Sequence, residues 1–485
     1  MSLRLCFPCA EYAPFAQAGG LGDVSAALAT YLHQQGHDVR VVLPWYRSVR
    51  ESGLDVRPVA QLAGRRLHYG THSISYSMLE ARRGADDAPL YLVDCPEFYD
   101  RDSLYGDSDH EHLRFALLCD ASIDLCESLD WAPDIMHCHD WHTALVPVLL
   151  GTRRHGGRLF EGCRSVLTLH NLGYQGVFDD SVVETLGLTP FRERLEWQDQ
   201  KTGCFSFLKN GMLMADWLST VSPTYAREIM TPEYGFGLDW LLRQREARVV
   251  GILNGVDYDE WDPAQDRLLP YPYSAEDLSG KSAMKSALLE RLDLGGHDGP
   301  LLTQVTRLTE QKGIDLLMQV LPTALERWPF ALAVLGTGEQ RFAEFYRYLA
   351  GRFPHQVRFV EAYSTELAHW LEAAGDMFLM PSRYEPCGLN QMYSLRYGTV
   401  PIVRRTGGLA DTVIPVDTAM NSGTGFVFDD YSAAALGAAL EAAMLLYAAP
   451  ADWRALMLRG MREDFSWQAQ GRLYEDFYRR MLAPQ

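Results

Sequence analysis

The stretch PSRYEPCGLNQMYSLRYGTVPIVRRTGGLADTV, from Pro381 to Val413, holds the residues that decide the fold. It combines the carboxylate of Glu385, the arginines Arg383, Arg404 and Arg405, and two glycine turns within an alternating strand and helix pattern. Guanidinium groups and backbone N–H groups presented by glycine bind phosphate oxygens, and a carboxylate accepts hydrogen bonds from sugar hydroxyls. The stretch therefore predicts a pocket for a sugar joined to a diphosphate. An alternative that involves no ligand explains the same residues: Glu-Pro forms a turn at the end of a strand, and Gly-Gly caps a helix.

The same alternation of apolar strand-like runs and amphipathic helix-like runs continues over the whole chain, as in parallel sheets with helical crossovers. One series extends from Arg4–Cys9 to Ser165–Leu169, and a second begins at Leu301–Val305. We therefore expect an α/β fold with two Rossmann-like domains facing across a cleft. The later strand-like runs of the second series are Ala331–Leu335, Val357–Val360, Met377–Met380 and Val400–Val403.

A chain of 485 residues is too long for one ordinary hydrophobic core. We predict an N-terminal domain over residues 1–250, a C-terminal domain over 251–465 and a final helix over 466–485. The segment Asp257–Ser274, rich in Pro, Asp and Tyr, is interpreted as a connector between the two series.

The formal net charge of −19 argues against nucleic acid or an anionic membrane surface as a partner. An anionic substrate would have to be held by a few local cations. No apolar run reaches the length of a transmembrane helix. Pro8 and Glu11 interrupt the apolar run at the N-terminus, which is not typical of a secretory peptide. We therefore predict a cytoplasmic protein, and nothing in the sequence indicates its oligomeric state.

The nine cysteines are scattered and do not form a disulfide framework. Cys6 and Cys9 have the spacing of a redox motif, but Cys6 lies inside the first predicted strand rather than at the start of a helix. The run His137–His142 contains metal-ligand residue types, but no second ligand pair follows at the distance that structural zinc sites use. We therefore expect no metal and no cofactor, and interpret these histidines as buried or hydroxyl-binding.

Glycines and cations follow predicted strands, where open α/β sheets bind ligands. Gly19 and Gly20, close to Gln17, would bring a phosphate to the backbone N–H groups of a helix start, although a tight turn alone would also need them. Arg307 and Lys312 would stabilise the charge on a departing diphosphate, unless they are ordinary solvated loop residues. A dinucleotide fingerprint is not matched, which disfavours a nicotinamide dehydrogenase.

Asp140, His170 and Asn171 follow two predicted strands of the first domain, whereas Glu385 follows a strand of the second. A sugar held from both sides would have its reacting carbon positioned and shielded from water. A single buried Asp or His is otherwise more often a structural residue.

Together these motifs resemble the bacterial glycogen synthases and plant starch synthases, the ADP-glucose-dependent glycosyltransferases of the GT-B architecture. The matching segments follow the family's order through almost the whole chain. They include AGGLGDV at 18–24, LRFALL at 113–118, HCHDWHTALVP at 137–147, TLHNLGYQG at 168–176, TRLTEQKGIDLL at 306–317, the stretch 381–413 and DFSW at 464–467.

The resemblance implies a retaining transfer of glucose from ADP-glucose to the non-reducing 4-hydroxyl end of an α-1,4-glucan, in glycogen biosynthesis. In such enzymes attack is commonly described as front-face, with the departing phosphate taking the proton of the acceptor hydroxyl. A double displacement through a carboxylate nucleophile stays open. The resemblance also implies that no metal is required, and that the last helix returns to the first domain.

Carried over position by position, the resemblance implies three groups of site residues. The catalytic group comprises His170, Arg307, Lys312, Glu385 and Asp140. The donor-binding group comprises Gln17, Gly19, Gly20, Asn254, Gly336, Gly338, Tyr363, Cys387, Gly388, Leu389, Thr406, Gly407 and Gly408, with Tyr363 stacking on adenine. The glucose or acceptor end comprises Tyr105 and Asn171.

Two positions depart from the family pattern. The family has lysine where this chain has Gln17, so an amide replaces a charge at the first glycine turn. We expect weaker donor binding or an altered preference between ADP- and UDP-glucose, because hydrogen bonds to charged groups are the stronger ones. Ala362, where the family often has glycine, would shift the adenine-stacking loop. Alternative functions are a UDP-glucose or small-sugar glucosyltransferase of the same architecture, and a glucan-binding pseudoenzyme.

Overall fold

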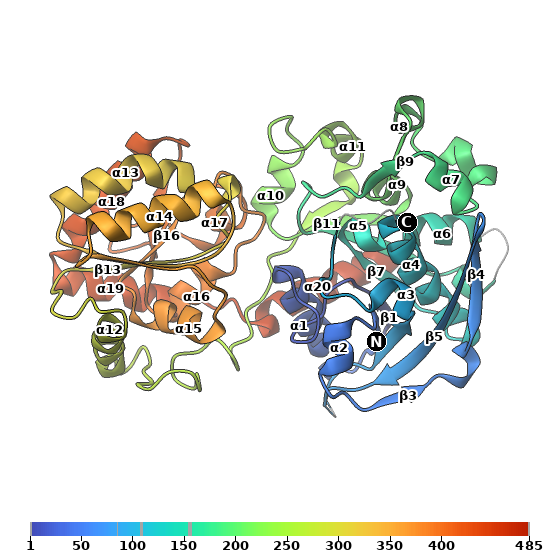
Figure 1. Cartoon of the computed structure of the whole chain (residues 1–485), viewed down its shortest axis with the longest axis horizontal. Helices are drawn as coiled ribbons and strands as arrows, with labels where there is room; N and C mark the ends of the chain where they lie inside the picture. The colour runs from blue at the N-terminus through green and yellow to red at the C-terminus, as the bar shows by residue number, and fades with distance from the viewer. Residues whose placement is uncertain (1, 85, 107–109, 154–157, 484–485) are drawn as a thin grey trace. The chain divides into compact units, whose positions relative to one another are not determined.

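The computed structural model describes residues 2–84, 86–106, 110–153 and 158–483 (Figure 1). The chain divides into two compact units, each with its own sheet. Unit 1 comprises the residues up to Val221, Ala226–Gly255 and those from Trp467 onward, and unit 2 comprises Ser222–Tyr225 and Val256–Ser466. The short segment Ser222–Tyr225 was not expected in the second unit. Within unit 2, the backbone N–H and hydroxyl of Thr224 both donate to the Asp411 carboxylate, at 2.9 and 2.6 Å.

The sheet of unit 1 has the strand order β12-β11-β8-β7-β1-β2-β6-β5-β3, with β4 paired to β5. The seven strands from β12 to β6 are parallel, as predicted. Their bounds are β1 Arg4–Pro8, β2 Asp38–Pro44, β6 Leu90–Asp94, β7 Ile135–His139, β8 Arg164–Leu169, β11 Trp217–Thr220 and β12 Val249–Gly251.

An antiparallel extension of this sheet differs from the expected all-parallel pattern. It consists of β3 Val56–Pro58, β4 Arg65–Tyr69 and β5 His72–Ala81. Buried and exposed side chains alternate in the first half of β5, as in a strand with one solvated face. The hydroxyls of Tyr69 and Tyr76 donate to Asp120 and Asp124 on α4 (Glu111–Ser128), which fixes the extension to the rest of the unit.

Unit 2 contains a six-stranded parallel sheet with the order β15-β14-β13-β16-β17-β18. Alternate side chains of its strands pack on opposite faces, so Leu302 joins the core on one side and Leu301 the core on the other. Figure 1 shows α13 and α14 on one side and α12 and α15 on the other. The strands are β13 Leu301–Val305, β14 Ala331–Leu335, β15 Val357–Val360, β16 Met377–Met380, β17 Val400–Arg404 and β18 Phe426–Phe428.

The helices surround these sheets and connect successive strands. In the first part of the chain they are α1 Gly20–Gln34, α2 Arg47–Glu51, α3 Pro96–Tyr99, α5 Asp140–Thr143, α6 Leu145–Arg153, α7 Ser181–Thr185, α8 Trp197–Thr202, α9 Phe207–Met214, α10 Pro223–Glu228 and α11 Asp239–Gln244, besides α4. A small hairpin pairs β9 Val177–Asp179 with β10 Cys204–Ser206. The helices of unit 2 are α12 Ser279–Arg291, α13 Ile314–Arg327, α14 Gln340–Arg352, α15 Thr365–Ala374, α16 Asn390–Arg396, α17 Gly407–Thr412, α18 Ala433–Tyr447 and α19 Pro450–Met461.

The last helix, α20 (Trp467–Leu482), packs within unit 1, as the sequence predicts. Its Tyr478 hydroxyl lies 2.7 Å from Nδ1 of His137 on β7. Gly471 permits close contact with α1, because a Cβ atom there would lie 2.2 Å from the ring of Tyr31. The helix therefore completes the hydrophobic core of unit 1.

Within the described ranges no single helix is long and apolar enough to span a membrane. The pair α18 and α19 passes the same test of length and composition when taken together, and it is bent by 113° at the break.

Candidate active site

The predicted site residues of unit 2 lie in loops at the carboxyl ends of its strands. Arg307 follows β13, Gly336 and Gly338 follow β14, Tyr363 follows β15 and Glu385 follows β16. In the strand order, β13 and β16 are neighbours. The chain continues from β13 to β14 on one side of this pair and from β16 to β17 on the other side. This is the topological switch point at which open α/β sheets bind ligands.

An ion pair joins two of the predicted catalytic residues at this point. Lys312 Nζ lies 2.6 Å from Glu385 Oε2, and Ser382 Oγ donates to the same oxygen at 2.9 Å. Both side chains are largely buried. Arg307 is exposed, and among the contacts of the described residues it has no ion-pair partner. Its guanidinium is therefore free to meet an anion, while Lys312 is already held in position.

The two glycine loops of the opening stretch pack against each other through their backbones. Gly408 N–H donates to the carbonyl of Glu385 at 3.0 Å. A Cβ atom at Gly407 would lie 1.9 Å from that carbonyl oxygen, and one at Gly408 would lie 1.9 Å from the carbonyl oxygen of Cys387. Only glycine fits at either position, so the segment Cys387-Gly388-Leu389 and the loop that begins at Thr406 form one structure.

The loops after β13 and β14 are in similar contact. Gly338 and Leu308 form a parallel bridge, and a Cβ atom at Gly336 would lie 2.0 Å from the carbonyl oxygen of Thr306. This holds both glycines beside the loop that carries Arg307. Tyr363 is not brought against these residues: its side chain is 86% exposed, which leaves its ring accessible to a planar ligand.

In unit 1 the structure brings together Asp140, His170 and Asn171. Asp140 Oδ1 accepts hydrogen bonds from the backbone N–H groups of His170 at 2.7 Å and Asn171 at 3.4 Å. Asp140 begins α5 with φ of 52°, a left-handed conformation that turns its carboxylate toward the end of β8. Burial raises the pKa of Asp140 to about 7, and the negative charge of Glu11 adds to the effect.

Three histidines of this region form a column in which His137 and His139 are buried and His170 is half-buried. His170 Nε2 lies 3.1 Å from His139 Nδ1, and the ring of His139 stacks on that of His137 at 4.3 Å. His137 in turn contacts Thr168 and the α20 residue Tyr478, at 2.6 and 2.7 Å. Burial lowers the pKa of His170 to about 3 and of His137 to about 3. His170 is therefore neutral at physiological pH.

Tyr105 and the first glycine turn meet at a carboxylate that sequence reasoning did not assign to the site. Glu11 accepts hydrogen bonds from the backbone N–H groups of Ala18 and Gly19, at 2.8 and 3.0 Å, and from the Tyr105 hydroxyl at 2.7 Å. Because these two N–H groups already donate to Glu11, the backbone N–H groups available to a phosphate are those of the first turn of α1, from Gly20. A Cβ atom at Gly19 would meet nothing within 4 Å, so the space in front of this helix start is open.

Asn254 lies in unit 1, whereas the predicted boundary at residue 251 placed it in the second domain. It follows β12, and its side chain is 5% exposed. Among the described residues its Oδ1 atom has no hydrogen-bond partner. An amide oxygen buried without a partner is costly, and a ligand hydroxyl would satisfy it.

The histidine-rich run 137–142 is not arranged as a metal site. In the described part of the chain no group of three His, Cys, Asp or Glu side chains could hold a metal ion. Its members are used otherwise: His142 stacks on Tyr105 with ring centroids 4.7 Å apart, and burial lowers the pKa of His142 to about 3.

Comparisons with known proteins give consistent matches along almost the whole chain. Residues 4–244 match the starch synthase catalytic domain, and residues 294–455 match glycosyl transferases group 1. The glycogen synthase of Anaeromyxobacter sp. (strain Fw109-5) is 45% identical, covering 99% of this chain and 100% of the relative. That of Geotalea daltonii is 41% identical, covering 99% of both chains. The chain belongs to the glycogen synthase family.

The solved structure of a starch synthase agrees with this membership. The catalytic domain of starch synthase IV from Arabidopsis thaliana, bound to ADP and acarbose, superimposes with a TM-score of 0.90 at 31% identity, covering 100% of both chains. Sucrose-phosphate synthase from Thermosynechococcus elongatus, with a TM-score of 0.58 at 17% identity, shares the fold alone. Membership of the glycogen synthase family makes the chain a glycosyltransferase of the two-domain GT-B architecture, as its motifs predict.

The residue at the lysine position of the glycogen synthase family is engaged within its own turn. Gln17 Nε2 donates to Asp23 Oδ2 at 2.8 Å, and both side chains lie at the surface. A lysine there would place a positive charge beside the same aspartate. Whether the amide weakens donor binding stays a prediction.

Proposed function

We propose that this protein transfers glucose from ADP-glucose, with retention of configuration, to the non-reducing 4-hydroxyl end of an α-1,4-glucan, as a glycogen synthase. The full-length identity of 41–45% to curated glycogen synthases carries this proposal. The adenine nucleotide is supported by the solved structure of the related starch synthase, which is bound to ADP.

The chemistry assigned to unit 2 is stabilisation of the leaving group. As the bond between the anomeric carbon and the diphosphate breaks, negative charge develops on the phosphate oxygens. The exposed guanidinium of Arg307 and the positioned ammonium of Lys312 would neutralise that charge. Glu385 would accept hydrogen bonds from the sugar hydroxyls, and the open ring of Tyr363 would stack on the base.

The chemistry assigned to unit 1 concerns the glucose ring. Neutral His170 would donate or accept a hydrogen bond without adding charge, and Asn254 would bond a sugar hydroxyl through its unsatisfied oxygen. The new bond forms between the acceptor oxygen and the anomeric carbon, and the departing phosphate takes the acceptor's proton. We propose that no metal takes part, because lysine and arginine supply the compensating charge. Transfer should then survive EDTA.

One assay tests donor, acceptor and activity together. The purified protein is incubated with glycogen and radiolabelled ADP-, UDP- or GDP-glucose, and precipitated glycogen is counted. The proposal expects label in glycogen from ADP-glucose, released by enzymes specific for α-1,4 linkages. Preference for UDP-glucose would overturn the donor, and label found only on small sugars would overturn the acceptor. No transfer by a folded protein would indicate a glucan-binding pseudoenzyme.

We also propose the cytoplasm as the compartment. All nine cysteines are free thiols, eight of them buried, which suits a reducing environment.

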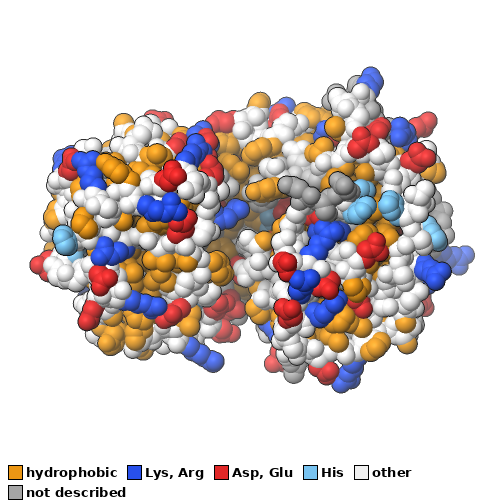
Figure 2. All heavy atoms as spheres, in the orientation of Figure 1, with side chains coloured by type: hydrophobic (Ala, Val, Ile, Leu, Met, Phe, Trp, Pro, Cys, Tyr) orange, Lys and Arg blue, Asp and Glu red, His pale blue; other side chains and the backbone are white. Residues whose placement is uncertain are grey.

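On the face shown in Figure 2, basic and acidic side chains are interspersed, which suits small-molecule and glucan substrates better than nucleic acid.

A further inference from the structure

Three large apolar side chains are exposed within one region of unit 1, close to the candidate site residue Asn171. They are Tyr174, Val177 and Phe236, which are 58%, 54% and 42% exposed. Tyr174 lies in the loop between β8 and β9, Val177 begins β9, and Phe236 precedes α11. Single exposed apolar side chains are ordinary, whereas a group of them beside a candidate site indicates a binding surface.

The contacts of Phe236 place its ring on the loop that carries Asn171. Gln175 Nε2 donates to the backbone carbonyl of Phe236 at 3.0 Å. A Cβ atom at Gly173 would lie 3.1 Å from Asn171 Oδ1 and 3.7 Å from two ring carbons of Phe236. The ring and the amide therefore both lie next to Gly173, and Tyr174 is the following residue. These side chains form one surface although Phe236 is distant in sequence.

The backbone holds Phe236 in a conformation that is uncommon for a bulky residue. Its φ is 48°, in the left-handed region. Gly235 before it has no room for a Cβ atom, which would lie 2.4 Å from that of Asp239, and Gly237 after it has φ of 81°. Leu238 N–H closes the turn by donating to Gly235 O at 2.7 Å. Strained residues of this kind cluster at ligand contacts, and here the turn presents an exposed aromatic ring.

The chemistry of this surface favours a neutral sugar over an anion. Asn171, Tyr174, Gln175, Val177 and Phe236 all have uncharged side chains. The C–H groups on the face of a glucose ring carry partial positive charge, so they pack against the negative face of an aromatic ring. Asn171 Oδ1 already accepts the Gly173 N–H at 3.0 Å, which leaves the side-chain N–H groups of Asn171 to donate to a sugar hydroxyl.

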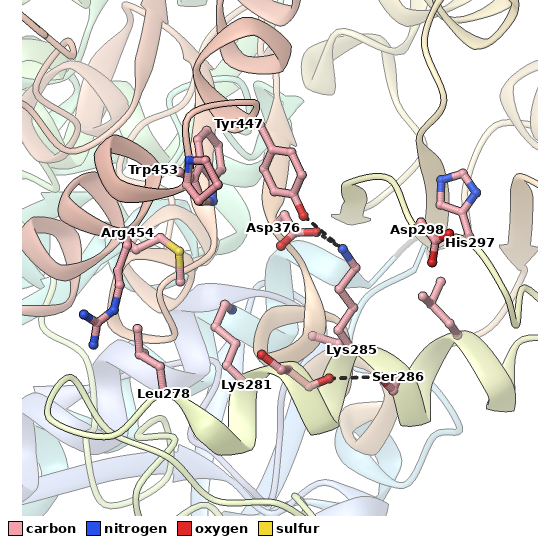
Figure 3. Close-up of a pocket in the computed structure, with 15 residues that line it drawn as sticks. Leu278, Lys281, Lys285, Ser286, His297, Asp298, Asp376, Tyr447, Trp453 and Arg454 are labelled. Carbon is pink, nitrogen blue, oxygen red and sulfur yellow. Dashed lines mark hydrogen bonds and ion pairs between the residues drawn. The ribbon is translucent and has the colours of Figure 1, made fainter.

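The aromatic rings of a cavity in unit 2 are not presented in this way (Figure 3). Tyr447 and Trp453 line this cavity of about 570 Å³. Trp453 is 5% exposed, and the ring of Tyr447 packs edge-on against it with centroids 5.2 Å apart. Figure 3 shows the Tyr447 hydroxyl pointing to Lys285, with Nζ at 3.2 Å. Both rings are engaged with the protein, so the exposed rings of unit 1 suit a sugar better.

We propose that Tyr174 and Phe236 bind the glucan acceptor, with their rings stacked on glucose units of the chain and Asn171 bonded to a hydroxyl. The proposal rests on the glucosyl-transfer function and assigns acceptor contacts to it. Because a chain of several glucose units can contact both rings, it should bind more tightly than a disaccharide. The two side chains should not affect the nucleotide-sugar donor.

Two measurements on the full-length protein test this proposal. Titration with maltoheptaose or maltose in the absence of donor gives Kd, and initial rates at saturating ADP-glucose give the acceptor KM. Phe236→Leu keeps an apolar side chain without the ring, and Tyr174→Ala removes the second ring. Each should raise Kd and KM for maltoheptaose by about three- to tenfold, the factor expected for one stacked ring, with KM for ADP-glucose unchanged. Phe236→Tyr retains the ring and should bind as wild type does.

Tyr348→Ala is the matched control, because Tyr348 is 54% exposed on α14 of unit 2, and it should change neither constant. Tyr174→Ala alters an exposed side chain, so it tests the proposal even if melting shows that Phe236→Leu is unfolded. The proposal is overturned if wild type does not bind maltoheptaose or binds maltose equally well. It is also overturned if the folded ring variants bind as wild type does, or if Tyr348→Ala weakens binding equally.

The two measurements also separate this proposal from the proposed function. Binding of maltoheptaose without glucose transfer by the wild type, with weaker binding in the ring variants, would contradict the function and support the surface. Transfer by the wild type with unchanged acceptor constants in the ring variants would contradict the surface alone.

Discussion

Lys312 and Glu385 form an ion pair of 2.6 Å that joins the loops after β13 and β16. These two strands are neighbours in the sheet although 71 residues separate the end of β13 from the start of β16. The side chains are 16% and 6% exposed, and Ser382 holds the same carboxylate oxygen. The lysine proposed to meet the diphosphate is thus positioned before any ligand arrives, which lowers the cost of ordering it on binding.

Replacing Lys312 by alanine should lower kcat/KM for the donor by about 10²–10³, the range for loss of one charge-stabilising group. Stability should also fall, because the buried carboxylate of Glu385 loses its partner. Initial rates and thermal unfolding measure the two effects. Arg327→Ala, which breaks an exposed pair with Glu441 on the same unit, should change neither. A Lys312→Ala enzyme with wild-type kcat/KM would remove the assigned role.

The contact between the two glycine loops gives a second prediction. Alanine at Gly408 would force its Cβ against the carbonyl oxygen of Cys387, so the loops must separate. We expect a loss of about 1–3 kcal/mol of stability together with a raised donor KM. Gly437→Ala is the control, because it lies inside α18 with nothing within 4 Å of the added atom, and it should stabilise by about 0.5–1 kcal/mol. Similar melting temperatures for the two variants would contradict the steric argument.

The strands of the parallel sheets could be predicted closely because they are buried on both faces. Met377–Met380 is an uninterrupted apolar run, and Leu301–Val305 is apolar except for the buried Thr303 and Gln304; the structure gives both strands the predicted bounds. His72–Ala81 is half polar and pairs antiparallel, so it lacks that signal. The segment Ser222–Tyr225 belongs to unit 2, where Thr224 donates two hydrogen bonds to Asp411, 187 residues away, which no local pattern reveals.

The positions of the candidate residues Asp140, His170 and Glu385 after strand ends were predictable from the general rule for open α/β sheets. Glu11 was missed because its role comes from the distant Tyr105, 94 residues along the chain. Its one sequence signal is a carboxylate three residues after the first strand, Arg4–Pro8, where it also interrupts the apolar run. The candidate site residue Asn254 lies in unit 1, which continues to Gly255, whereas the predicted boundary at residue 251 placed it in the second domain.

Gln17→Lys tests the departure from the family pattern. The amide of Gln17 donates to Asp23 next to the open start of α1, so a lysine would bring a positive charge to that place. We expect a lower KM for ADP-glucose, by about three- to tenfold, since charged hydrogen bonds contribute more than neutral ones. Gln35→Lys adds the same charge at the other end of α1 and should leave KM unchanged. An unaltered KM and an unaltered ADP/UDP preference in Gln17→Lys would refute the idea.

The raised pKa of Asp140 predicts opposite pH dependences of activity and stability. Burial raises this pKa from 3.8 to about 7 in the folded protein. Below pH about 7 the carboxyl is protonated and its hydrogen bonds from His170 and Asn171 weaken, so kcat/KM should fall by about tenfold per pH unit. A raised folded-state pKa contributes stability that is complete below pH 3.8 and is lost as the pH rises through about 7.

Asp140→Asn isolates this titration, because asparagine has the same shape and adopts the left-handed conformation found at φ of 52°. In the variant the fall in kcat/KM below pH about 7 should be flattened, and the melting temperature should lack the stabilisation that protonation of Asp140 adds to wild type as the pH falls. His170 stays neutral in the folded protein over this range because burial lowers its pKa to about 3, so it should not change kcat/KM there. It does lower stability below pH about 6.5, where the unfolded chain binds a proton, but equally in both proteins, so the difference between the two profiles reports Asp140. Parallel pH–rate and pH–melting profiles of the two proteins give the measurement. If Asp140→Asn keeps the wild-type pH dependence in both, another group is responsible and the carboxylate of Asp140 does not control the loop that carries His170.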